Sequence, residues 1–135
     1  MATVSSGNVV LFGAGGPVGA STITSLKDHY TLRVTDLRPM EEVAVSPPQS
    51  ARAPIPEVLA APHENRVVDI TDYDQVLAAC QGMDAAIDLS VLRPHPVLAF
   101  HVNMIGAYNV AKACAACGVK RLIHTGPFHT SLNFN

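Results

Sequence analysis

A group of closely spaced glycines near the N-terminus is typical of a turn that binds phosphate. The group consists of Gly13, Gly15, Gly16 and Gly19. In such a turn the first glycine permits a sharp bend, the second lets backbone N–H groups approach a pyrophosphate, and the last lets a helix pack closely on a strand. Pro17 and Val18 would open that helix, whose positive end faces the pyrophosphate.

A carboxylate follows the glycines at the distance that a dinucleotide site requires. Asp36 lies 23 residues after Gly13, where it would accept hydrogen bonds from the ribose hydroxyls of adenosine. Its charge would repel a 2′-phosphate, so the sequence favours NAD over NADP, although Arg38 could face such a phosphate. The alternative is a tight turn kept only for packing. We expect dinucleotide binding because the glycines and the acid occur in the order that this site needs.

The elements that must position these residues alternate along the chain. Strands are expected at residues 8–12, 31–36, 66–69, 84–89 and 119–125. Helices are expected at residues 17–28, 71–82 and 96–117. This alternation predicts an α/β fold, a Rossmann-like doubly wound parallel sheet of about five strands in the order 3-2-1-4-5.

Local signals refine the boundaries of these elements. Thr71 and Asp72 are candidate caps of the second helix, with Asp74 placed to complete a capping box. Residues 37–66 hold six of the ten prolines, so we expect a long, mobile surface connection with at most one helical turn, near residues 56–61. The connection lies within a single domain that spans residues 1–135.

Composition narrows the classes of protein. The chain has 135 residues, 48% of them hydrophobic and 15% charged, with a formal net charge of -2. No basic stretch suits nucleic acid, and no apolar run reaches the ~18–20 residues of a membrane span. Without a signal peptide the protein is expected to be cytoplasmic, and three cysteines do not suggest a disulfide framework.

Several further motifs occur in a fixed order. They are the G-x-x-G-x-x-G pattern of Gly13, Gly16 and Gly19, the triplet Val68-Asp69-Ile70, the segment from Asp84 to Ser90, the segment from Val102 to Asn109, and the segment from Gly118 to Ile123. Together they resemble the N-terminal, cofactor-binding part of the extended short-chain dehydrogenase/reductase family, the NAD-dependent epimerases and dehydratases. The resemblance implies that Asp69 and Ile70 hold adenine, that Leu89, Ser90 and Val91 line the nicotinamide half, and that Asn103 approaches the cofactor.

The chain departs from that family's pattern in three places. Asp88 stands where the family usually has histidine or a small polar residue, and Thr125-Gly126-Pro127 replaces a run of serine and threonine that supplies a catalytic hydroxyl. The family's catalytic Tyr-x-x-x-Lys lies beyond the fifth strand, and the chain ends at Asn135 before reaching it. The catalytic residues therefore stay unknown, and the domain is expected to be incomplete relative to the family.

Three other patterns are better explained by packing. Tyr108 and Lys112 have the spacing of the catalytic pair but precede the fifth strand, so a packed tyrosine and a surface lysine are expected. Cys114 and Cys117 lie in an alanine-rich helix without a second pair. The six histidines show no metal-binding spacing, so no metal site is predicted.

The leading functional hypothesis is the NAD-binding part of an oxidoreductase that transfers hydride to or from a nucleotide sugar or a similar hydroxyl or carbonyl substrate. One alternative is a non-catalytic NAD(P)-binding or regulatory module. Another is an inactive fragment whose open sheet edge would form a homodimer or aggregate through the fifth strand.

Overall fold

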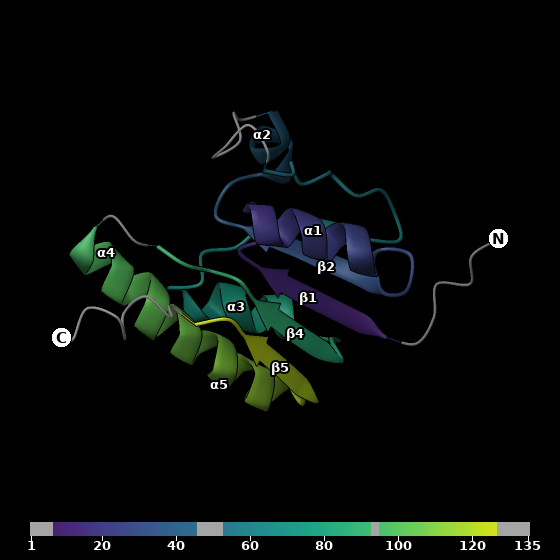
Figure 1. Cartoon of the computed structure of the whole chain (residues 1–135). Helices are drawn as coiled ribbons and strands as arrows, with labels where there is room; N and C mark the ends of the chain where they lie inside the picture. Colours follow the sequence, from purple (N-terminus) through teal and green to yellow (C-terminus); the bar gives the residue numbers. More distant parts are fainter. Residues whose placement is uncertain (1–6, 46–52, 93–94, 127–135) are drawn as a thin grey trace.

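Five parallel strands form a single sheet at the centre of the molecule (Figure 1). The computed structural model describes residues 7–45, 53–92 and 95–126. The strands are β1 (Asn8–Phe12), β2 (Thr31–Asp36), β3 (Glu64–Val67), β4 (Ala85–Asp88) and β5 (Arg121–His124). Their order is β3-β2-β1-β4-β5, and every neighbouring pair is parallel, which confirms the predicted topology.

Helices cover both faces of the sheet, as Figure 1 shows for α1 on one side and α3 and α5 on the other. The helical segments are α1 (Pro17–Leu26), α2 (Met40–Val45), α3 (Tyr73–Cys80), α4 (Pro96–Phe100), the π-helical segment η1 (His101–Gly106) and α5 (Ala107–Cys117). Where the structure describes the chain, no helix is both long and apolar enough to cross a membrane.

The hydrophobic core consists of two clusters, one on each face of the sheet. Val10 and Phe12 of β1 join one cluster with α3 and α5, whereas Val9 and Leu11 join the other with α1. Successive side chains of a strand point to opposite faces, so a strand in the middle of a two-sided sheet is apolar throughout. This requirement explains why β1 could be located from its sequence.

The proline-rich connection contains more structure than predicted. A short helix, α2, occupies residues Met40–Val45, and its Met40 and Val43 side chains are buried. Pro39 lies just before this helix, where its carbonyl accepts from Val43 N, so this proline does not interrupt it. The helical turn predicted near residues 56–61 is wrong, and residues 46–52 of the connection lie outside the described parts of the chain.

Two other local predictions need correction. β3 covers Glu64–Val67 rather than residues 66–69 because its register is set by β2, where Arg33 pairs with Glu64 and Asp36 with Val67. The N-cap of α3 is Asp72, and Asp74 does not complete a capping box. The side chain that reaches back to Asp72 is instead that of Gln75, whose Nε2 donates to the carboxylate at 3.0 Å.

The helix predicted at residues 96–117 is present but not uniform. Residues 101–106 form the π-helical segment η1 between α4 and α5. Gly118 ends α5 with a φ of 70°, the left-handed conformation expected of a glycine just beyond a helix. The six-residue π segment was not predictable from periodicity, and it carries Asn103, one of the candidate site residues.

Candidate nucleotide site at the carboxyl edge of the sheet

The glycine turn bends sharply from β1 onto the end of β4. Gly13 has a φ of +69°, and a Cβ atom at this position would lie 2.7 Å from the backbone N and Cα atoms of Ser90. Leu89 N donates to the Phe12 carbonyl at 2.9 Å, so the backbone just past β4 stays against the end of β1. The turn therefore needs glycine both for its conformation and for the close approach of a second strand.

Gly16 and Gly19 shape the N-terminus of α1: one leaves open space beside it and the other allows close packing. A Cβ atom at Gly19 would collide with the Ala14 carbonyl, so this glycine lets the helix pack against the turn. Gly16 is the N-cap and makes no side-chain cap bond, and the space beside it is open. Val18 in the first turn is 61% exposed. The first N–H groups of a helix have no partner within it, so this open end suits an anion.

Asp36 connects the end of β2 to the glycine turn. Its Oδ2 accepts a hydrogen bond from Gly15 N at 2.8 Å, and its Oδ1 accepts one from Arg38 N at 3.4 Å. A Cβ atom at Gly15 would lie 2.7 Å from the same Oδ2 atom. The Gly15 N–H therefore orients the acid and is not available to a ligand. The N–H groups available to an anion are those at the start of α1, beside the open space at Gly16.

The residues expected around adenine lie at the end of β3 and are fixed by their neighbours. Asp69 Oδ1 accepts from the backbone N and the side-chain hydroxyl of Thr71 at 2.9 and 2.7 Å. Ile70 is 7% exposed and touches Gly106 of η1, where any added Cβ would collide with it. Asn109 Nδ2 donates to the Ile70 carbonyl at 3.0 Å. These contacts join the β3 end to the 101–117 helical segment.

The residues expected near nicotinamide lie at and beyond the end of β4. Ser90 N donates to Asp88 Oδ1 at 3.0 Å, and Val91 is 44% exposed. Asn103 does not present a free amide, because its Oδ1 accepts from Leu92 N at 3.0 Å and its Nδ2 donates to the Leu92 carbonyl at 2.8 Å. Asn103 therefore holds the segment after β4 in place.

A histidine and a carboxylate that sequence reasoning did not pair meet at the same edge. Asp88 and His124 are register partners on β4 and β5, and His124 Nδ1 lies 3.0 Å from Asp88 Oδ2. The sequence marks Asp88 as a departure from a family pattern, and it gives His124 no metal-binding spacing and no other role. The available signal was that both lie one residue before the expected ends of neighbouring strands, at residues 89 and 125.

The tyrosine and lysine of the false catalytic motif do not pair. Tyr108 is 63% exposed, so the expectation that it packs is wrong. Lys112 is on the surface as expected, with its Nζ 4.5 Å from the centre of the Tyr73 ring. The ammonium thus makes a cation–π contact across two helices, a use for which residue spacing gives no signal.

The cysteines pack as small apolar residues, as predicted. Cys80 and Cys114 are buried with their sulfur atoms 3.9 Å apart, and all three thiols are free. The contact with Cys114, together with burial, raises the pKa of Cys80. No group of three or more potential metal ligands occurs within residues 7–45, 53–92 and 95–126.

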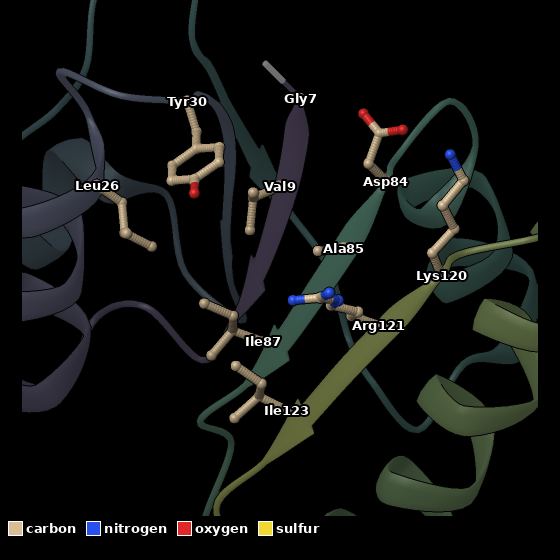
Figure 2. Close-up of a pocket in the computed structure, with 10 residues that line it drawn as sticks. All are labelled: Gly7, Val9, Leu26, Tyr30, Asp84, Ala85, Ile87, Lys120, Arg121 and Ile123. Atoms are coloured by element: carbon tan, nitrogen blue, oxygen red, sulfur yellow. The ribbon is translucent and has the colours of Figure 1, made fainter. Parts of the chain in front are cut away.

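A hollow of about 420 Å³ lies on the α1 face of β1, β4 and β5, as Figure 2 shows. Its apolar lining includes Val9, Ile87 and Ile123. Gly7, Asp84 and Lys120 mark its position near the amino ends of these strands. The hollow therefore does not coincide with the glycine turn, which is at the carboxyl edge where parallel sheets bind ligands.

The sheet order, the glycine turn after β1 and the acid at the end of β2 define a Rossmann-like α/β protein of the short-chain dehydrogenase/reductase type. The chain belongs to the 3-beta hydroxysteroid dehydrogenase/isomerase family, whose model matches residues 10–131. This assignment confirms the resemblance inferred from the ordered motifs.

Individual relatives agree with the fold and the family. The chain is 32% identical over 103 residues to 3beta-hydroxysteroid-dehydrogenase/decarboxylase isoform 2 of Arabidopsis thaliana, a match that covers 73% of this chain and 18% of the relative. Uronate dehydrogenase from Agrobacterium tumefaciens has a TM-score of 0.67 at 23% identity, covering 87% of this chain and 39% of that one. A short-chain dehydrogenase/reductase superfamily protein from the same organism, solved with bound NAD, has a TM-score of 0.66 at 23% identity, covering 87% and 31%. The chain thus spans well under half the length of these relatives.

Proposed function

We propose that this chain is the NAD-binding part of an oxidoreductase that interconverts a secondary alcohol and a ketone. The observation that carries the proposal is the carboxylate of Asp36, fixed by Gly15 N at the end of β2 beside the open N-terminus of α1. A dinucleotide needs both an acid for its ribose and helix N–H groups for its pyrophosphate, and this edge of the sheet offers the two together.

Each part of the dinucleotide has a proposed place along that edge. The pyrophosphate would lie at the N-terminus of α1, beside Gly16, Pro17 and Val18. The adenine would lie near Asp69 and Ile70, and the nicotinamide half near Leu89, Ser90 and Val91. When bound, the dinucleotide supplies a hydride acceptor or donor. Asn103 contributes indirectly, because its two bonds to Leu92 keep the segment after β4 in position.

The proposed cofactor is NAD rather than NADP. Asp36 carries its charge where the adenosine ribose would bind, and a 2′-phosphate there would meet that charge at close range. Arg38 is exposed and follows Asp36 by two residues, but it donates its backbone N–H toward the carboxylate.

The proposed substrate class is a secondary alcohol or its ketone. The family description and the Arabidopsis relative both name a 3β-hydroxysteroid, whereas the motif resemblance implied a nucleotide sugar. Both kinds of substrate carry a secondary hydroxyl on a ring, and this shared group is the part that a hydride transfer needs.

Replacement of Asp36 by alanine tests this proposal. We expect the variant to bind NAD⁺ about tenfold or more weakly, because hydrogen bonds to a charged group contribute roughly 1.5–3 kcal/mol, while binding of NADP⁺ changes less or improves. Titration calorimetry of the wild-type chain and of Asp36→Ala with NAD⁺ and NADP⁺ measures these affinities. Equal loss for the two cofactors would contradict the ribose role of Asp36.

We also propose that copies of the chain associate through β5. Like β3 at the other end of the described sheet, β5 is hydrogen-bonded on one side only, and all four of its residues are exposed. An edge strand with unpaired N–H and C=O groups and apolar side chains is a template for pairing with another chain.

A further inference from the structure

We propose that His124, oriented by Asp88, is a contact for the nicotinamide half of the dinucleotide, where its Nε2 accepts a hydrogen bond from a ribose hydroxyl. This inference rests on the proposed function, since it places a further residue in the same site. It concerns the end of the site opposite to Asp36.

The topology places the pair where a ligand is expected. The chain leaves β1 toward β2 on one side and returns to β4 on the other, so the carboxyl ends of β1 and β4 flank the point where the strand order reverses. Asp88 is the last residue of β4 and the register partner of Phe12, the last residue of β1. His124 is its partner on the far side, at the end of β5. Both side chains therefore belong to the edge that also carries the glycine turn.

The hydrogen bonds of Asp88 determine which nitrogen of His124 is available. The Asp88 side chain is 1% exposed, and its two oxygens are occupied by Ser90 N and by His124 Nδ1, each at 3.0 Å. An ionised carboxylate can only accept, so the hydrogen must reside on Nδ1. In the neutral ring Nε2 is then an acceptor. A hydroxyl of a ligand is a matching donor.

The residues that the structure describes cover the His124 ring only in part. The His124 side chain is 34% exposed, unlike its partner. Beside its Nε2 and Cδ2 atoms lies Gly126, whose φ is +59° and whose missing Cβ would be 3.8 Å from both. Thr125 is bonded through its backbone N and its hydroxyl to the Asp88 carbonyl at 3.2 and 3.3 Å. The end of β5 is thus fixed. Because residue 126 is a glycine, it places no side chain beside the Nε2 edge of the ring.

The competing explanation is that the pair only joins β4 to β5. A structural ion pair would affect folding and would influence every ligand of the domain alike. A contact with the nicotinamide half would influence only ligands that possess that half. Comparison of NAD⁺ with ADP, which contains the adenosine and pyrophosphate portions alone, separates the two explanations.

The test is calorimetric titration of NAD⁺ and of ADP into the wild-type chain and into His124→Gln, Asp36→Ala and His63→Gln. His63 is the matched control, because its ring also makes a hydrogen bond, here with Nδ1 accepting from Leu32 N near the start of β2 at the opposite edge of the sheet. We expect His124→Gln to weaken NAD⁺ binding about threefold to tenfold, the usual effect of losing one hydrogen bond, and to leave ADP binding unchanged. Asp36→Ala should weaken both ligands, and His63→Gln neither.

The role of Asp88 as a positioning residue has its own readout. In the wild-type chain the ¹⁵N NMR shifts of the His124 ring should report a hydrogen on Nδ1, and Asp88→Asn should shift the ring toward the other tautomer and weaken NAD⁺ in parallel. Because Asp88 is buried, this variant could fail to fold, and His124→Gln then decides alone.

Each outcome decides the inference. Unchanged NAD⁺ binding in His124→Gln, with a loss in Asp36→Ala, would overturn the inference and leave the proposed function intact. An equal loss of NAD⁺ and ADP in His124→Gln would assign the pair a structural role and would also overturn it. If the wild-type chain bound neither ligand, the proposed function itself would fail, and the inference with it.

Discussion

Arg33 is a charged residue at the centre of an apolar strand, and it is 8% exposed. Its guanidinium donates to both oxygens of Glu64, from Nε at 2.9 Å and from an outer nitrogen at 3.2 Å. The other outer nitrogen donates to the Ala79 and Gln81 carbonyls at 2.8 Å each. A buried charge is tolerated when it is paired and hydrogen-bonded, so Arg33 connects β2, β3 and the end of α3.

This arrangement predicts a pH-dependent contribution from Glu64. The hydrogen bond from Arg33 holds the pKa of Glu64 below its usual range, against the opposing effect of burial. A lowered carboxyl pKa stabilises the fold above the unfolded-state pKa, and this stability is lost as the pH falls through the folded-state pKa. Glu64→Gln should therefore reduce the free energy of unfolding at pH 7, by about 1 kcal/mol because the Glu64 side chain is 42% exposed.

Urea denaturation at several pH values measures this effect. The difference between wild type and Glu64→Gln should shrink as the pH falls below the ordinary glutamate pKa of about 4.3. It should be lost once the native carboxylate, whose pKa is lower, is also protonated. The control is Glu57→Gln, whose carboxylate pairs with Lys27 at the surface and should matter less. A difference that stays constant down to pH 2 would show that charge is not its cause.

Single residues could be predicted from the sequence where their role depends on the neighbouring turn or strand alone. The glycine of the β1 turn and the acid after β2 could be predicted because their spacing reflects a single short turn and strand. His124 could not be assigned from the sequence, because its partner is 36 residues away and their meeting depends on the pairing of β4 with β5.

At the scale of elements, the start of α3 shows how a short helix is fixed at its end. Asp72 has an extended backbone, and its carboxylate accepts from Asp74 N at 3.0 Å and Gln75 N at 3.3 Å. Gln75 in turn accepts from Asp69 N at 3.0 Å. Unpaired N–H groups of the first turn are thereby satisfied, and the helix is tied to the end of β3.

The cap leads to a prediction with a matched control. Asp72→Ala should lower the free energy of unfolding by about 1 kcal/mol, the typical cost of losing an N-cap side chain. Asp74→Ala removes a carboxylate two residues later that does not cap the helix, and should cost only a few tenths of a kcal/mol through the helix dipole. Thermal denaturation followed by circular dichroism would compare them. Equal losses would argue for the capping box through Asp74 that the sequence suggested.

The elements that could be predicted are those whose signal is local. β1 and β2 have the bounds expected from their apolar patterns, and the long helix begins and ends at Pro96 and Cys117 as expected. β3 was displaced by two residues because its register comes from contacts with β2. α2 was missed because its stability comes from burial of Met40 and Val43, which a run of prolines nearby concealed.

At the scale of the whole molecule, the α1 face of the sheet is incompletely covered. Figure 2 shows Ile87 of β4 and Ile123 of β5 along the same side of the hollow, and Ile123 is 59% exposed. Exposed apolar side chains beside an edge strand favour association. Each Å² of apolar surface that the contact removes from water stabilises it by roughly 25 cal/mol.

Ile123→Lys tests the proposed association. A buried ammonium in the contact would be costly, so the dissociation constant of a dimer should rise at least about tenfold, equivalent to 1.4 kcal/mol. Light scattering coupled to size-exclusion chromatography across a range of concentrations measures it. Ile55→Lys is the control, because Ile55 is 51% exposed but does not line the hollow. A wild-type chain that is monomeric at every concentration would exclude the association.

The bond between Asp36 and Gly15 has a consequence for any redesign of cofactor preference. The usual way to admit a 2′-phosphate is to remove the acid at the end of the second strand. In this chain that change would also release the backbone of the glycine turn, since the same carboxylate holds both. The proposed cofactor selectivity and the rigidity of the glycine turn therefore depend on the same carboxylate. A variant designed to accept the phosphate would need a new acceptor for the Gly15 N–H.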